Sequence, residues 1–102
     1  MLPLRPNLKK YSGTKPELRA KVNERNQHVH RTINHLHRMI ADNEPGWHQY
    51  YFADIAIDLK IPMPLVRSAV APLGGSNGIT LFVREDDLQK LRARLKAQAL
   101  NQ

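Results

Sequence analysis

Histidine is the residue type in this chain best suited to metal or acid–base chemistry, and the 102 residues include five. Four of them, His28, His30, His35 and His37, lie in one stretch, and the fifth is His48. A zinc-binding helix presents two histidines one turn apart, at positions i and i+4. Here the spacings are two, five and two residues, and His28 and His35 would stand roughly 10 Å apart along a helix axis. The sequence therefore predicts no metal site on one helix and no cofactor.

The carboxylates and hydroxyls form no pattern typical of an enzyme. Asp54 and Asp58 fall on one face of a predicted helix, where a solvated acidic face explains them. No serine has the flanking residues of a nucleophile, and the glycine-rich stretch 74–78 is typical of a turn rather than of a phosphate-binding loop. The absence of cysteine excludes disulfides and thiolate chemistry. We therefore predict that the protein is not an enzyme.

The distribution of charge gives the clearest functional signal. The formal net charge is +7 overall, with +7 on residues 1–38, −2 on residues 39–83 and +2 on residues 84–102. A basic excess is typical of proteins that bind nucleic acid, because phosphate neutralisation supplies most of the affinity. A soluble protein with a basic tail is the simpler alternative.

The basic residues are positioned by an N-terminal arm and a long helix. Residues 1–13 contain two prolines and a glycine, which predicts a basic flexible arm. Thr14 is a suitable N-cap for the helix that follows, and Pro16 suits the first turn of that helix. Four apolar residues in this helix have helical spacing and form a stripe: Val29, Ile33, Leu36 and Ile40. The stripe predicts that the helix runs on to the turn at 43–46. The helix is either continuous with a polar middle or broken near 23–26.

The rest of the chain predicts short elements in a regular order. Aromatic residues 47–52 are typical of a strand, and the following apolar spacings predict two short helices joined by a tight turn. A glycine-rich turn, a second strand and an amphipathic last helix complete the chain. The expected ranges are 53–59 and 64–71 for the helix pair, 79–83 for the second strand and 85–102 for the C-terminal helix.

This order of elements resembles the winged helix-turn-helix superfamily over roughly residues 27–84. Ala56 matches the small residue where the two helices of such a pair cross. The inward-facing apolar positions match as well, at Ile55, Leu59, Ile61, Val66 and Ala69. Two features depart from the pattern. Lys60 replaces the glycine common in the turn, and the short uncharged link after Leu73 leaves room for a minimal Asn-Gly hairpin or for no wing.

The resemblance implies a mostly α fold with a small β-hairpin or short sheet. Residues 14–84 would form a winged helix-turn-helix domain with a reduced wing, between the arm at 1–13 and the extra helix at 85–102. It also implies that the helix at 64–71 lies against double-stranded DNA, with Pro64, Arg67 and Ser68 facing outward. Arg67 would pair with guanine or with a phosphate. The predicted phosphate contacts are Lys60, Arg5, Lys9, Lys10, Lys15, Arg31 and Arg38, with Arg5 able to enter a minor groove.

We therefore predict a sequence-specific DNA-binding protein, a small cytoplasmic transcription regulator without a membrane segment. The apolar stripes of the first and last helices favour a homodimer. The alternative is a winged-helix module that binds a protein partner and does not read DNA. A third function, binding of single-stranded nucleic acid, would need exposed rings at Trp47, Tyr50 and Tyr51, and we expect these rings to be mostly in the core.

Overall fold

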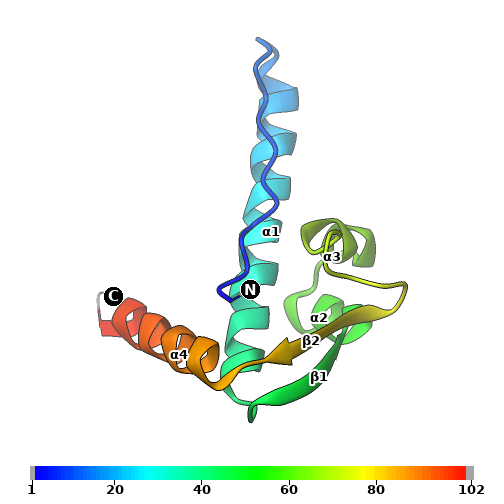
Figure 1. Cartoon of the computed structure of the whole chain (residues 1–102). Coiled ribbons are helices and arrows are strands. Elements are labelled where there is room, and N and C mark those ends of the chain that lie inside the picture. The colour runs from blue at the N-terminus through cyan, green and yellow to red at the C-terminus, as the bar shows by residue number, and fades with distance from the viewer. Residues whose placement is uncertain (1, 101–102) are drawn as a thin grey trace.

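A computed structural model describes residues 2–100 of the chain. Within this range four helices and a two-stranded antiparallel sheet follow one another in the order α1, β1, α2, α3, β2 and α4 (Figure 1). The architecture confirms the prediction of a mostly helical chain with a short sheet. Residues 1, 101 and 102 lie outside the described residues. They are the first residue of the predicted arm and the last two residues of the predicted C-terminal helix.

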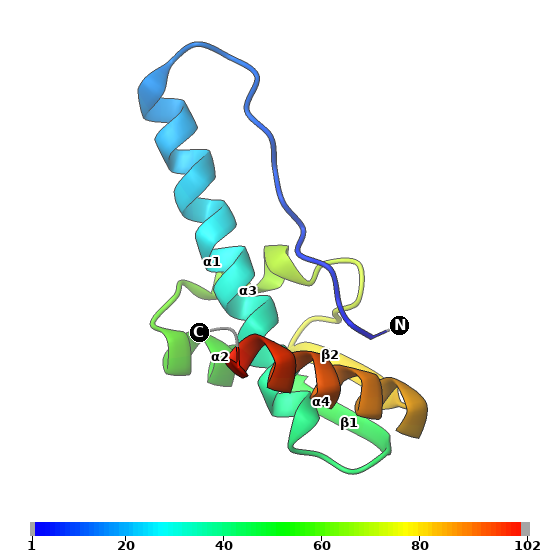
Figure 2. The same ribbon diagram turned by 90° about the vertical axis from the view of Figure 1, so that its left-hand side faces the viewer.

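Helix α1, Pro16–Ala41, is one continuous helix of 26 residues. At a rise of 1.5 Å per residue it is about 39 Å long. All of its buried residues lie in the C-terminal half, where Val29, Ile33, Leu36 and Ile40 confirm the predicted stripe. The N-terminal half projects beyond the other helices (Figures 1 and 2). The prediction of a Thr14 cap is wrong, because Lys15 occupies the N-cap position without a side-chain cap bond and Pro16 begins the helix.

The N-terminal segment, residues 2–13, is extended and runs back along α1 (Figure 2). Leu4 is buried in the core, and its backbone N–H donates a hydrogen bond to Nε2 of His37 at 2.9 Å. Further along, Asn26 makes a reciprocal pair of hydrogen bonds with the backbone of Lys9, at 3.0 and 2.8 Å. The segment is thus extended as predicted, but it is packed against the domain. Apolar burial of Leu4 and the paired backbone groups of Leu4 and Lys9 hold it there.

Strand β1, Gly46–Tyr51, leads directly into the helix pair α2, Phe52–Leu59, and α3, Met63–Ala69. Lys60 turns the chain between the two helices with φ 56° and ψ 46°, a left-handed conformation in which glycine is the unstrained residue. The apolar residues that face inward from the pair are buried, as the spacing predicted: Ile55, Ile61, Val66 and Ala69. Helix α3 ends two residues before the predicted position, because Pro72 disfavours a longer helix.

Strand β2, Gly78–Val83, pairs with β1 in a register from Gly46 opposite Val83 to Tyr51 opposite Gly78. The sheet therefore joins the chain before α2 to the chain after α3. Between α3 and β2 the backbone makes a tight turn, closed by a single antiparallel bridge between Gly74 and Ile79. The inward face of β2 is buried as predicted, through Ile79, Leu81 and Val83.

Helix α4, Glu85–Leu100, packs Leu88 and Leu91 into the core beside the end of α1. The guanidinium of Arg92 donates to the backbone carbonyls of Ala41 and Asn43 at 2.9 and 2.8 Å. These bonds satisfy acceptors where α1 ends, a point at which a helix leaves carbonyls without partners. Of the helices in residues 2–100, none combines the length and the apolar character needed to cross a membrane.

Candidate functional site

The outward face of α3 presents Met63, Pro64 and Arg67, all exposed. Arg67 lies between two hollows, one against the turn 74–77 and the other lined by Tyr51, Met63 and Asn77. Its guanidinium forms no ion pair or hydrogen bond with any other part of residues 2–100. A free guanidinium in this position can bind a phosphate or the edge of a guanine through two parallel hydrogen bonds.

Ser68 lies on another side of α3, and the structure corrects the prediction that it faces outward. Its Oγ accepts a hydrogen bond from Arg25 at 2.9 Å, and its backbone carbonyl accepts one from Asn7 Nδ2 at 2.9 Å. Arg25 also donates to the Asn7 carbonyl at 2.8 Å. The three residues therefore tie α1 and the N-terminal segment to α3. The roles of Arg25 and Asn7 were missed, because contacts across 18 to 61 positions leave no local sequence signal.

Two of the predicted cations, one on α1 and one in the turn itself, lie at the turn between α2 and α3. Arg31, on α1, donates to the backbone carbonyl of Leu59 at 2.8 Å, so it satisfies a free carbonyl at the end of α2. Lys60 follows directly and its side chain is exposed. Arg31 thus has a structural contact that the sequence did not predict, whereas Lys60 is free to meet a ligand.

The corner between the projecting half of α1 and the start of α3 forms a third hollow. From α1 it is lined by Lys21, Glu24, Arg25 and His28, and from the other side by Pro62 and Leu65. In Figure 1 the upper part of α1 and helix α3 form the two sides of this corner. Lys21 and Arg25 give the corner a basic character, and neither is paired with an acid.

The remaining predicted cations are spread along α1 and the N-terminal segment rather than gathered in one cluster. Lys9, Lys10 and Lys15 belong to the projecting end, and Arg5 is exposed beside the buried Leu4. Arg38 is exposed in the last turn of α1. From its rise, the helix separates Lys15 from Arg31 by about 24 Å and from Arg38 by about 35 Å.

Almost none of this positive charge is neutralised by ion pairs within residues 2–100. Among the lysines and arginines of residues 2–100, Arg84 alone takes part in an ion pair, with its Nε 3.6 Å from Oδ1 of Asp86. The others are exposed or half-buried, and those with hydrogen bonds donate to neutral acceptors. A surface of unpaired cations attracts polyanions and releases their counterions on binding.

The histidines act as structural partners of their neighbours. Burial lowers the pKa of His37, helped by the positive charge of Arg94, so the ring is held neutral and accepts the Leu4 N–H. His35 Nε2 is buried and lies 3.4 Å from Oδ2 of Asp58, but it makes no hydrogen bond within the described residues. Within the described part of the chain no three metal-ligating side chains form a group that could hold an ion.

The aromatic residues of the sheet differ most from the prediction. Trp47 is 71% exposed and Tyr51 48% exposed, whereas Tyr50 is buried at 5%. The prediction of a mostly buried aromatic cluster is therefore wrong for Trp47 and Tyr51 and confirmed for Tyr50. Alternation along β1 places Trp47 and Tyr51 on the outer face, where Trp47 is paired across the strands with Phe82.

Comparison of the chain with family models, with curated proteins and with solved structures found no match.

Proposed function

We propose that the chain is a winged helix-turn-helix protein that binds double-stranded DNA through α3 and acts as a small transcription regulator. The observation that carries the proposal is Arg67, an unpaired guanidinium on the exposed face of a helix that follows a tight helix–helix turn. The left-handed Lys60 supports the scaffold, since it provides the turn for which the superfamily commonly uses glycine. The bridge from Gly74 to Ile79 corresponds to a wing reduced to a four-residue turn.

Affinity would come from the cations around α3. A duplex lying across the outward face of α3 would meet Arg67 in a groove and the exposed Lys60 at the turn before the helix. Lys21 and Arg25 would add positive charge on the α1 side. Because Leu4 is buried beside it, Arg5 is proposed as a phosphate contact and not as a minor-groove probe.

Sequence discrimination would be limited by the length of α3. Only Met63, Pro64 and Arg67 project from its outward face, and one bidentate arginine discriminates against a wrong base by about 1–3 kcal/mol. A homodimer reading two half-sites would multiply this small preference. We therefore include a homodimer and a palindromic site in the proposal.

The second candidate is a winged-helix module that binds a protein instead of DNA. It is favoured by the exposed rings of Trp47 and Phe82 on the sheet, because contiguous exposed apolar surface is typical of interaction sites. The net charge of −2 on residues 39–83, which contain both helices of the pair, favours it too.

Fluorescence anisotropy of labelled duplexes over a salt series tests the proposal. We expect duplex binding whose affinity falls steeply as salt rises, and undetectable binding to every duplex near physiological salt would contradict it. Arg67→Ala should weaken binding to a selected site by about 1–3 kcal/mol and to random duplexes much less. The matched control is Arg84→Ala, which removes the same charge from a guanidinium already paired with Asp86 and should change both affinities little. Equal losses on the two DNAs would remove Arg67 from sequence discrimination.

A further inference from the structure

The outer face of the two-stranded sheet carries three exposed rings, Trp47, Tyr51 and Phe82, which we call the aromatic face. Trp47 and Phe82 are opposite each other in the register, with ring centroids 5.3 Å apart in an edge-to-face arrangement. Phe82 is 53% exposed and Trp47 71% exposed, so the pair buries only part of its area within the chain. Large aromatic side chains of this kind are the usual anchors of protein interfaces.

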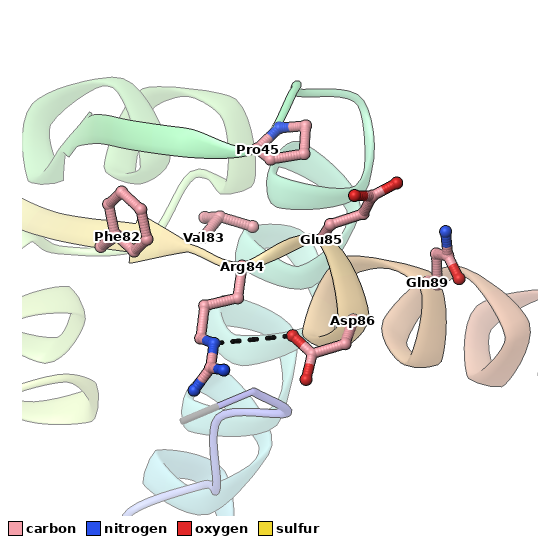
Figure 3. Close-up of a pocket in the computed structure, with 7 residues that line it drawn as sticks. All are labelled: Pro45, Phe82, Val83, Arg84, Glu85, Asp86 and Gln89. Carbon is pink, nitrogen blue, oxygen red and sulfur yellow. Dashed lines mark ion pairs between the residues drawn. The ribbon is translucent and has the colours of Figure 1, made fainter.

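Hollows lie on both sides of the Phe82 ring. One is lined by Trp47, Phe82 and Asp87. The other, drawn in Figure 3, is lined by Pro45, Phe82 and Glu85. The aromatic face therefore provides two shallow recesses, each with a carboxylate at its edge.

Arg84 also lines both hollows, but its one ion pair within residues 2–100 is with Asp86 and not with either of these carboxylates. Arg84 is paired with Asp86 at 3.6 Å, and neither Glu85 nor Asp87 forms an ion pair within residues 2–100. Figure 3 shows the Glu85 side chain directed toward Pro45, whereas Arg84 and Asp86 point to the opposite side of the chain. The residues from Arg84 to Asp87 thus carry a local net charge of −2 in a chain of net charge +7.

The start of α4 accounts for part of this charge, because acids in a first helical turn are stabilised by the helix dipole. It does not account for the exposed rings beside them. Together, rings and free carboxylates disfavour a phosphate-bearing ligand, since like charges repel at this range. They suit a cation, which is attracted both by the face of a tryptophan ring and by a carboxylate.

We propose that the aromatic face binds a lysine- or arginine-rich segment of a partner protein. Cationic side chains of that segment lie over Trp47 and against Phe82, and their charges pair with Asp87 and Glu85. The hollows that hold Trp47, Phe82, Glu85 and Asp87 include no residue of α3, although Tyr51 at the other end of β1 lines the hollow beside Arg67. The site therefore adds a second binding activity that does not depend on DNA recognition.

A peptide titration of the full-length protein tests this site. The probe is a labelled lysine-rich peptide followed by anisotropy, while Trp47, the one tryptophan of the chain, reports contact through its own fluorescence. We expect saturable binding that changes the Trp47 emission and weakens with salt. A glutamate-rich peptide, which the unpaired cations elsewhere on the protein attract, should leave the Trp47 emission unchanged. Phe82→Thr, which retains a strand-forming residue, and Asp87→Asn should each weaken binding about three- to tenfold.

Asp54→Asn is the matched control, because it removes one exposed carboxylate from α2 rather than from the aromatic face, and it should leave the peptide affinity unchanged. Thermal melts establish that each variant is folded; should Phe82→Thr unfold, Glu85→Gln takes its place with the same expected loss. Peptide binding that neither Phe82→Thr nor Asp87→Asn weakens would overturn the proposal. So would binding of a single-stranded oligothymidine, in the absence of peptide, that changes the Trp47 emission and is weakened by Phe82→Thr, which would make the face a base-stacking platform. Self-association of the protein alone that is lost in Phe82→Thr would assign the face to a second copy and also overturn it.

Discussion

Replacing Lys60 with glycine separates the contribution of this residue to stability from its contribution to binding. Lys60 holds φ 56° and ψ 46° at the end of α2, where a residue with a Cβ atom costs about 1–2 kcal/mol. Glycine avoids that strain but loses about 0.5–1 kcal/mol more backbone entropy on folding. The difference predicts that Lys60→Gly raises the free energy of unfolding by up to about 1.5 kcal/mol. For a domain near this size, 1 kcal/mol corresponds to a rise in melting temperature of about 4–8 °C.

The matched variant is Lys60→Ala, which removes the charge but keeps the Cβ atom and its strain. If Lys60 contacts a phosphate as proposed, both variants should reduce the slope of log affinity against log salt by about 0.9. Only the glycine variant should melt at a higher temperature than the parent protein. Thermal melts followed by circular dichroism measure the change in melting temperature, and duplex anisotropy over a salt series measures the change in salt slope.

The effect of Lys60 on stability and its effect on DNA binding can be tested independently. A glycine variant that melts below the temperature of the parent protein would refute the strain assigned to the left-handed turn. A salt slope unchanged in both variants would show that Lys60 meets no phosphate, and it would leave the stability argument intact.

Two further predictions concern the fold that holds the site. Burial lowers the pKa of His37, and the neutral ring accepts the Leu4 N–H. The stabilisation from this ring is therefore complete above the ordinary pKa of 6.5 and is lost as pH falls through the lower pKa of the folded protein. Urea unfolding across this pH range should show the loss of stability, and a His37→Gln variant should show less of it. Gly78→Ala should destabilise the protein by at least about 2 kcal/mol, because the added Cβ would collide with the backbone of Tyr50. Gly75→Ala should be nearly neutral, because a Cβ there meets only a carbonyl 3.7 Å away. Equal melting temperatures of the two variants would refute this prediction.

Periodicity predicted the fold wherever an element buries one face. The stripe of α1 and the alternation of β2 were both correct, because a residue shifted by one position would expose an apolar side chain. The same alternation places Phe82 on the outer face. Trp47 was assigned to the core by residue type, although its exposure is decided by pairing with a strand more than 30 positions later. Such a register depends on the whole sheet and not on local pattern.

The candidate site was predicted only in part for a similar reason. Arg67 could be placed on the outer face of α3 from helical spacing alone, and the structure leaves it exposed. Ser68 has a comparable position in the sequence but faces the N-terminal segment, because Arg25 and Asn7 reach it from distant parts of the chain. The docking of Leu4 onto His37 spans 33 positions. Proline and glycine content predicted the extended backbone of this segment but carried no information about the surface it packs against.

Selection of bound duplexes from a random pool tests most directly the central claim that α3 reads double-stranded DNA through Arg67. We expect enrichment of a short motif, repeated as a palindrome with half-sites about one helical turn apart. The same selection with Arg67→Ala should lose the preference for one base pair in each half-site while still recovering DNA. A pool that shows no enrichment over its starting composition with the parent protein would contradict the claim.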